Sequence, residues 1–209
     1  MLPKLSIYAL KPAFQRLLRP IVVRCAAVGI TANTVTLSTM LASCLLGVLL
    51  LVAGQTEVFL LLPLWMFLRM ALNAIDGMLA REHGQQSRLG AYLNELCDLI
   101  SDAALYLPFV CVPPFGWGSI ASVIFLATIS EMAGALGTSI GNARRYDGPM
   151  GKSDRAAVFG GLGLALGLQG TLPDWSFWIM PLVAVLIALN IINRVRGGLS
   201  NTTIAERSR

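Results

Sequence analysis

The sequence predicts an all-α integral membrane protein with six transmembrane helices and an N-terminal amphipathic helix. Of its 209 residues, 56% are hydrophobic and only 13% are charged, and the mean hydropathy is +0.70. No soluble domain of this size needs so many apolar residues. The basic residues also alternate between successive connections, which is typical of a chain that crosses a bilayer repeatedly.

Six apolar segments are candidate spans, because a helix needs about 20 apolar residues to cross the hydrocarbon core. They are residues 34–53, 57–80, 90–112, 118–141, 155–170 and 175–195. We therefore expect a single membrane domain over residues 1–209. It would comprise a juxtamembrane segment (1–30), a six-helix bundle (31–198) and a cytoplasmic tail (199–209).

The N-terminal segment has a helical pattern and no signal-peptide core. Apolar side chains alternate with Gln15, Arg16 and Arg19 at helical spacing; they are Phe14, Leu17, Leu18, Ile21 and Val22. This pattern favours an amphipathic helix that lies on the cytoplasmic surface. A disordered basic leader is the alternative.

Lysine and arginine occur near both termini and in alternate connections, such as 81–88 and 144–155. The connections at residues 54–56, 113–118 and 171–174 carry none. This distribution predicts that both termini are cytoplasmic. Together with unpaired cysteines, it suggests a bacterial inner membrane. The net charge of +5 then reflects topology and anionic headgroups, and it is poor support for binding nucleic acid.

Two polar stripes are expected at the cytoplasmic ends of the second and third spans. Because each helical residue turns about 100°, Arg69, Asn73, Asp76 and Ala80 fall within about 60° of one another. On the next helix, a second stripe falls within about 100°; it consists of Asn94, Glu95, Asp98 and Asp102. Carboxylate and amide oxygens without Cys or a nearby His suit a hard cation such as Mg²⁺ or Mn²⁺.

These stripes carry a motif that resembles the signature of the CDP-alcohol phosphatidyltransferases. The family motif reads Asp-x-x-Asp-Gly-x-x-Ala-Arg, then about eight residues, then Gly-x-x-x-Asp-x-x-x-Asp. Six fixed positions match here; they are Asp76, Gly77, Ala80, Arg81, Gly90 and Asp98. Asn73 and Asn94 stand where the family usually has Asp. Thr31-Ala-Asn33-Thr-Val-Thr36 also resembles the family's entry to its first membrane helix.

The resemblance implies a reaction, a cofactor and roles for residues. An alcohol would attack the lipid-linked phosphorus of a CDP-alcohol, usually CDP-diacylglycerol, and CMP would leave. Asp98 would be the catalytic base, and Asp76 a metal ligand. The nucleotide would lie near Asn33, Thr36, Asp76, Gly77, Ala80, Arg81 and Gly90. The resemblance also implies a homodimer.

The metal count is open, because the family typically holds two divalent ions with four motif carboxylates. Asn73, Asp76, Asn94 and Asp98 occupy the ligand positions, yet each Asn keeps an oxygen ligand without its negative charge. We hypothesise that Glu95 or Asp102 restores ligand charge, or that one ion binds instead of two. The alternative is that Glu95 and Asp102 support other ligands or pair with Arg69.

The basic connection before the fifth predicted span is a candidate acceptor site. Lys152 and Arg155 lie near the membrane and could hold an anionic group of the acceptor alcohol. Arg144 and Arg145 are better explained as positive-inside anchors. Within the spans, Arg69 and Glu131 would each be costly alone, so we expect them to pair with each other or with the polar cavity.

Two other classes of function stay open. The two Asn substitutions are compatible with a relative that binds CDP-lipid or CMP without turnover. A small transporter is also conceivable because intramembrane charges mark transport paths, but the polar stripes lie at one side and not at the midplane. The sequence does not identify the acceptor alcohol.

Overall fold

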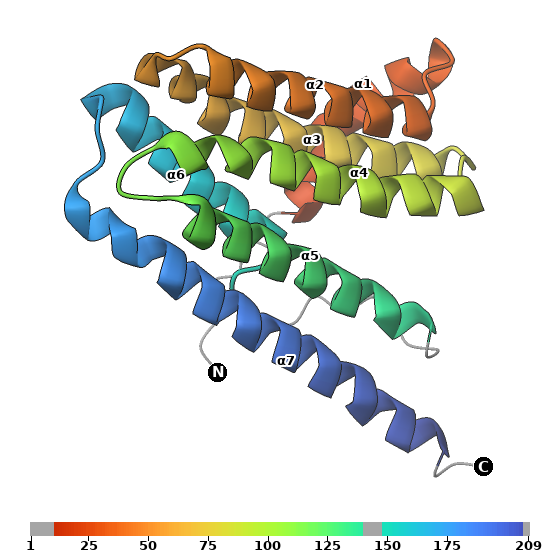
Figure 1. Cartoon of the computed structure of the whole chain (residues 1–209). Helices are drawn as coiled ribbons and strands as arrows, with labels where there is room; N and C mark the ends of the chain where they lie inside the picture. Colours follow the sequence, from red (N-terminus) through yellow and green to blue (C-terminus); the bar gives the residue numbers. More distant parts are fainter. Residues whose placement is uncertain (1–10, 140–147, 207–209) are drawn as a thin grey trace. The chain divides into compact units, whose positions relative to one another are not determined.

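The structure is a computed structural model that describes residues 11–139 and 148–206. These residues form helices joined by short turns, and no strand occurs among them (Figure 1). The all-α prediction is therefore confirmed for this part of the chain. Arg144 and Arg145, predicted to be anchors, lie outside the described residues.

Seven α-helices follow one another along the described chain. They are α1 (Lys11–Ala27), α2 (Ala32–Val52), α3 (Leu61–Glu82), α4 (Arg88–Tyr106), α5 (Trp117–Ser139), α6 (Lys152–Gln169) and α7 (Ile179–Glu206). Short 3₁₀ helices at Thr56–Leu60, Leu107–Cys111 and Asp174–Trp178 precede α3, follow α4 and precede α7. Helices α2 to α7 match the six apolar segments expected from the sequence.

Four helical segments in the described residues are long and apolar enough to cross a membrane. They cover Ala32–Val52, Thr56–Glu82, Trp117–Thr138 and Asp174–Leu199. Helices α4 and α6 are not among them, because charged side chains within α4 and in the first turn of α6 lower their hydropathy. Four spans are thus supported by length and composition, and the count of six stays a prediction.

The chain divides into two compact units, and the boundary falls inside α2, α3 and α4. The first unit comprises residues 1–42 and 67–98, and the second comprises residues 43–66 and 99–209. We describe each unit by itself.

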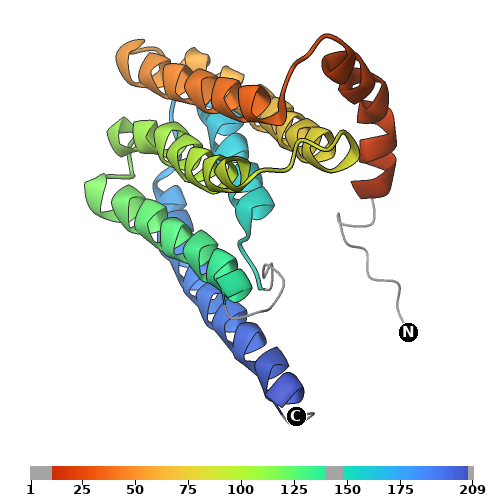
Figure 2. The same ribbon diagram turned by 90° about the vertical axis from the view of Figure 1, so that its right-hand side faces the viewer.

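The core of the first unit is built from α1, α2 and α3. Its buried side chains are Leu18, Val22, Ala32, Val35, Ala71, Ile75, Met78 and Leu79. Figure 2 shows α1 and the loop that leads from it into α2. Residues 12–22, which were expected to form an amphipathic helix, are helical, with Leu18 and Val22 buried and Leu17 exposed. The position of α1 at a membrane surface stays a prediction.

The turn between α3 and α4 also holds the start of α2. Gly84 has φ +66°, the left-handed conformation that commonly ends a helix, and the Gln85 N–H donates to the Ala80 carbonyl at 3.1 Å. The Gln85 side-chain oxygen then accepts the Ala32 N–H at 2.7 Å. This bond satisfies a backbone donor at the start of α2, so the start of α2 is tied to the turn that joins α3 and α4.

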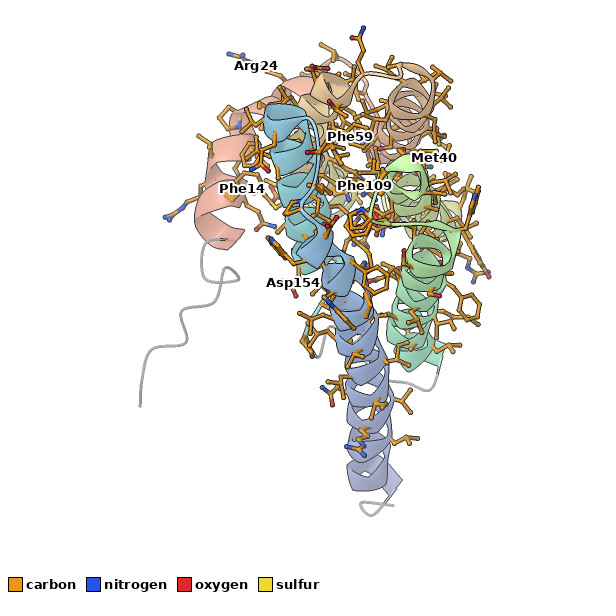
Figure 3. The ribbon with its side chains drawn as sticks, turned by 60° about the vertical axis from the view of Figure 1, so that its left-hand side comes forward. Phe14, Arg24, Met40, Phe59, Phe109 and Asp154 are labelled. Carbon is orange, nitrogen blue, oxygen red and sulfur yellow. The ribbon has the colours of Figure 1, made fainter. Side chains whose placement is uncertain are left out.

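The second unit has an aromatic and aliphatic core. Figure 3 labels Phe59 and Phe109, whose ring centroids lie 5.2 Å apart, and Tyr106 stacks on Phe159 at 3.8 Å. Helices α5 and α7 pack side by side (Figures 1 and 2). Helix α6 packs closely on residues 56–60. The glycine at position 167 permits this approach, because a Cβ there would lie 2.6 Å from the Leu60 side chain.

Candidate functional site

The predicted catalytic base lies in the first unit on α4, and two side chains of α3 contact it. The Asn73 amide donates from Nδ2 to Asp98 Oδ1 at 3.1 Å. The Arg69 guanidinium approaches the same oxygen at 3.3 Å and donates to the Asp98 carbonyl at 3.0 Å. The two predicted polar stripes therefore meet at Asp98.

The second motif carboxylate, Asp76, is buried and bonded from α2. It is 5% exposed, and the Thr36 hydroxyl donates to its Oδ2 at 2.9 Å. Thr36 was predicted from the flanking segment and Asp76 from the motif, so the fold joins two independent parts of the sequence pattern. A buried carboxylate needs such a donor, because the loss of its hydration is otherwise costly.

The glycine at position 90 leaves room for side chains that lie very close to the backbone of α4. A Cβ built there would lie 2.9 Å from Asn33 Oδ1 and 3.0 Å from the Ser87 hydroxyl. A Cβ at that distance would force the Asn33 side chain to shift, so glycine lets Asn33 rest against the first turn of α4. The structure thus brings together two residues that were predicted to lie near a nucleotide.

Gly77 and Arg81 form a second contact of this kind on α3. A Cβ on Gly77 would lie 3.0 Å from Arg81 Nη1, so the guanidinium rests on the bare backbone one turn earlier. Arg81 is exposed, and Ala80 beside it is half-buried. An exposed guanidinium over open backbone suits a phosphate group, which it can bind through two parallel N–H donors.

The other predicted metal ligands do not all lie in the same unit. Asn94 and Glu95 are half-buried on the part of α4 that belongs to the first unit. Asp102 belongs to the second unit, where its Oδ2 lies 3.2 Å from Arg155 Nη2. The metal-ligand role of Asp102 stays a prediction.

The donor set around Asp76 and Asp98 fits a hard divalent cation. It consists of carboxylate, hydroxyl and amide oxygens, which are the ligands of Mg²⁺ and Mn²⁺. The motif supplies only two carboxylates, however, and Arg69 contacts one of them. Among the described residues, no group of three or more His, Cys, Asp and Glu side chains could hold a metal ion. Any ion here must depend on neutral amide or hydroxyl oxygens as well.

A separate charge network fills the interior of the second unit. The fully buried Arg155 donates from Nη2 to Asp102 at 3.2 Å and to Glu131 at 3.0 Å. Glu131 also lies 3.5 Å from Arg194. Two arginines and two carboxylates therefore compensate one another, as buried charges must. Glu131 pairs here with Arg155 of α6 and Arg194 of α7, partners that the sequence analysis did not predict for it.

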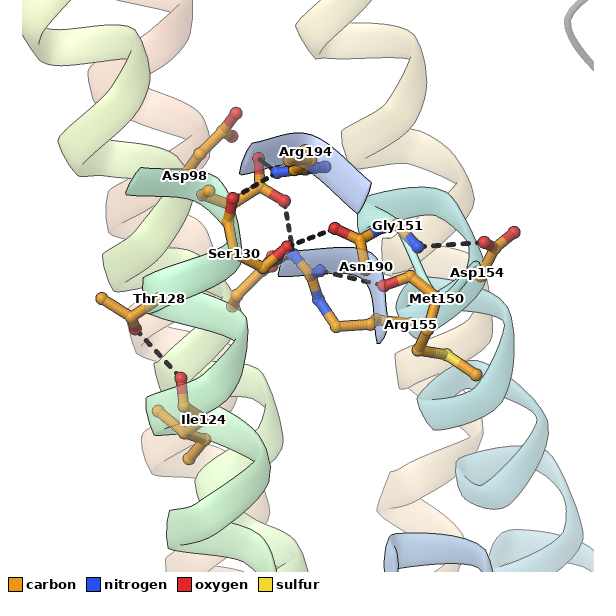
Figure 4. A network of polar contacts seen from close by, with 12 residues as sticks. Asp98, Ile124, Thr128, Ser130, Met150, Gly151, Asp154, Arg155, Asn190 and Arg194 are labelled. Atoms are coloured by element: carbon orange, nitrogen blue, oxygen red, sulfur yellow. Dashed lines mark hydrogen bonds and ion pairs between the residues drawn. The ribbon is translucent and has the colours of Figure 1, made fainter. Parts of the chain in front are cut away.

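Residues that the sequence reasoning did not single out complete this network (Figure 4). Ser130 donates to Asn190 Oδ1 at 2.7 Å, and the Asn190 amide donates to the Pro149 carbonyl at 2.8 Å. Arg194 donates to the Ser130 carbonyl, and Arg155 donates to the Met150 carbonyl at 3.3 Å. Asn190 could have been found from the sequence, because it is a polar residue within an otherwise apolar segment.

The predicted acceptor residues differ in accessibility. Lys152, in the first turn of α6, is half-buried, whereas Arg155 is 0% exposed and already pairs with two carboxylates. An anionic group of an acceptor would have to compete with Asp102 and Glu131 for Arg155. The acceptor role of both residues stays a prediction.

Comparison with known proteins places the fold and the motif in one family. A sequence model of the CDP-alcohol phosphatidyltransferases matches residues 29–192. The inner membrane protein YnbA of Escherichia coli strain K12 is 45% identical over 192 residues, which cover 92% of this chain and 96% of that protein. A phosphatidylinositol phosphate synthase of Mycobacteroides abscessus is 25% identical, covering 89% of this chain and 86% of its own.

Solved structures share the fold. The Mycobacterium tuberculosis phosphatidylinositol phosphate synthase with CDP-DAG bound superposes with a TM-score of 0.70 at 19% identity, covering 88% of this chain and 94% of that one. The same enzyme in complex with manganese and citrate gives a TM-score of 0.69 at 21% identity, covering 86% and 88%. The family match spans most of the chain and includes the motif on α3 and α4. The chain therefore belongs to the CDP-alcohol phosphatidyltransferase family of enzymes.

Proposed function

We propose that this protein transfers a phosphatidyl group from CDP-diacylglycerol, or another CDP-alcohol, to an alcohol acceptor and releases CMP. The observation that carries the proposal is the set of contacts within the first unit. Thr36 bonds Asp76, Asn33 rests on Gly90, and Asn73 bonds Asp98. Three helices thus present the motif residues in mutual contact, as one reaction site requires.

Each residue of the site has a proposed step. Asp98 accepts the proton of the acceptor hydroxyl as its oxygen bonds to the lipid-linked phosphorus. The bond between that phosphorus and the CMP oxygen then breaks. Arg81 binds a phosphate of the donor, while Gly77 and Ala80 leave room for the nucleotide. Asn33, Thr36 and Gly90 line the nucleotide from α2 and α4.

A divalent cation, Mg²⁺ or Mn²⁺, would be held by Asp76 with oxygens of the neighbouring motif positions. When bound, such an ion neutralises pyrophosphate charge and stabilises the leaving phosphate. The manganese complex of the mycobacterial structure supports a metal requirement here, and the CDP-DAG complex supports the donor.

The apolar helices and a named relative also support a proposal for the cellular location. The four apolar helices and the E. coli relative that is named an inner membrane protein support a multi-pass protein of the inner membrane. We propose six spans, both termini in the cytoplasm and a homodimer. Lys152 and Arg155 would meet the acceptor alcohol, whose identity we leave open.

The test is CMP release by the purified protein in lipid nanodiscs. CDP-diacylglycerol would be supplied with Mg²⁺ or Mn²⁺ and a panel of acceptors: glycerol phosphate, inositol phosphate, serine and simple polyols. We expect release that depends on both acceptor and metal and that Asp98→Ala abolishes. The alternative, a relative that binds without turnover, is favoured by Asn73 and Asn94. It predicts CDP-lipid binding with no CMP release from any acceptor.

A further inference from the structure

The segment of the second unit that leads into α6 has a backbone conformation that other parts of the fold must hold. Gly148 has φ +100° and Met150 has φ +59°, so a residue with a side chain adopts the left-handed conformation here. Such a conformation persists only where the surrounding structure determines it, and it is common in segments that clamp a ligand. Contacts made by side chains from elsewhere in the fold therefore fix residues 148–151.

Asn190 of α7 makes one of these contacts. Its Nδ2 donates to the Pro149 carbonyl at 2.8 Å, and a Cβ built on Gly148 would lie 2.9 Å from its Cα. The glycine at position 148 thus lets the segment lie directly against the backbone of α7. Arg155 makes a second contact, because its Nη1 donates to the Met150 carbonyl at 3.3 Å (Figure 4). Two consecutive carbonyls of the segment therefore accept bonds from side chains of two helices, α7 and α6.

Ser130 of α5 fixes the direction in which the Asn190 amide faces. A carbonyl can only accept, so the amide nitrogen must face Pro149 and the amide oxygen must face Ser130. The Ser130 hydroxyl donates to that oxygen at 2.7 Å (Figure 4). Ser130 and Asn190 are both 0% exposed, so water cannot take the place of either bond. Helix α5 therefore acts on the segment before α6 through one amide of α7.

We propose that Asn190, oriented by Ser130, is a positioning residue that fixes residues 148–151 and thereby places Lys152 for the acceptor alcohol. The inference rests on the proposed function, in which Lys152 meets the acceptor. Lys152 is the first residue of α6 and follows the bonded segment directly, so a shift of that segment moves its backbone. A misplacement of about 1 Å can cost about 100-fold in rate. Because Lys152 would bind the acceptor without reacting, the loss is expected in the KM for the acceptor.

The first measurement is hydrogen–deuterium exchange of the full chain in lipid nanodiscs, which needs no substrate. Asn190→Leu keeps a similar side-chain volume but cannot donate to Pro149. We expect faster exchange in peptides that span residues 148–158, with unchanged exchange in the rest of α5 and α7. Ser130→Ala removes a single hydroxyl and should give a smaller change in the same peptides; it carries the test if Asn190→Leu does not fold.

The second measurement is the kinetics of CMP release with the panel acceptor that supports release by the wild-type protein. We expect the acceptor KM to rise about tenfold in Asn190→Leu and about threefold in Ser130→Ala. The kcat and the KM for CDP-diacylglycerol should stay within about twofold of wild type. Ser176→Ala is the matched control, since Ser176 is 1% exposed in the same unit and its hydroxyl donates to the Pro173 carbonyl at 2.6 Å. The control should lower Tm as Ser130→Ala does but leave the acceptor KM unchanged.

Three results would contradict the proposal. Unchanged exchange of residues 148–158 in both variants would show that Asn190 does not hold the segment. Faster exchange throughout α5 and α7, or an equal rise of the acceptor KM in Ser176→Ala, would reduce its role to general stability. A fall in kcat at an unchanged acceptor KM would remove the link to the acceptor. Separately, no CMP release by the wild-type protein with any acceptor of the panel would overturn the proposed function and the acceptor role with it, whereas the exchange data would still report whether Asn190 fixes the segment.

Discussion

Each unit of this protein has a buried arginine against carboxylates, and the two sites differ in what solvent can reach. In the first unit, Arg69 is 4% exposed but its partner Asp98 is 22% exposed. In the second unit, Arg155 is 0% exposed and both Asp102 and Glu131 are 7% exposed. The same residue types therefore form one pair whose carboxylate keeps contact with solvent and one network that is almost fully buried.

The residue types of an arginine–carboxylate pair therefore do not set its role; the surroundings of the pair do. A carboxylate that keeps contact with solvent can exchange a proton or meet a substrate directly, whereas a ligand can reach a buried pair only by displacing one of its partners. Arg155, Asp102, Glu131 and Arg194 come from α6, α4, α5 and α7, so this network ties four helices of the second unit.

The largest expected effect separates two aspartates of α4. Asp98→Asn removes the proposed base, so we expect CMP release to fall by about 10³-fold; Tm should also fall, because the buried Arg69 loses its charged partner. Asp102→Asn is the matched control: it should lower Tm through Arg155 and reduce CMP release by less than about tenfold. Equal rate losses with unchanged Tm would instead favour the predicted metal-ligand role of Asp102.

Arg155→Met should have the next largest effect, on stability. It leaves two buried carboxylates without this partner, and breaking a buried pair costs about 3–5 kcal/mol. For a chain of this length, we expect Tm to fall by about 10 °C, measured by thermal aggregation in detergent. If Arg155 instead serves mainly to bind an anionic acceptor, Tm will hold and only the acceptor KM will rise.

Thr36→Val tests whether α2 supports the reaction site. The valine has nearly the same volume but cannot donate to Asp76, and a hydrogen bond to a charged group contributes about 1.5–3 kcal/mol. We expect kcat/KM for CDP-diacylglycerol to fall by at least about tenfold. Thr34→Val is the control, because Thr34 is exposed and its hydroxyl contacts only Thr31 among the hydrogen bonds described. An equal loss in the control would refute a specific role.

The smallest expected effect is that of Gly90→Ala. The new methyl group would displace Asn33 from α4, and we expect the affinity for CMP, measured by calorimetry, to fall about fivefold, or about 1 kcal/mol. Gly161→Ala is the matched control, since nothing lies within 4 Å of a Cβ built on that helical glycine of α6. Unchanged CMP affinity in Gly90→Ala would remove Asn33 from the proposed nucleotide site.

Much of the fold was accessible from the sequence because apolar segments and the motif are local signals. The six apolar segments correspond to α2 through α7, and the family suggested by Asp76, Gly77, Arg81 and Asp98 is confirmed. The count of spans was less accessible, since α4 and α6 mix apolar residues with charges that only an assembled interior can compensate.

Local sequence patterns were enough to predict the all-α class, the approximate positions of α2 to α7 and the family, since these depend on hydropathy and on residues close together in the chain. The folded structure was needed to learn which charges pair. It placed Arg69 on Asp98, and it placed Glu131 between Arg155 and Arg194. Helical spacing gives the face of one helix, but the partner of a buried charge depends on how separate helices pack, and that is not written in any local pattern.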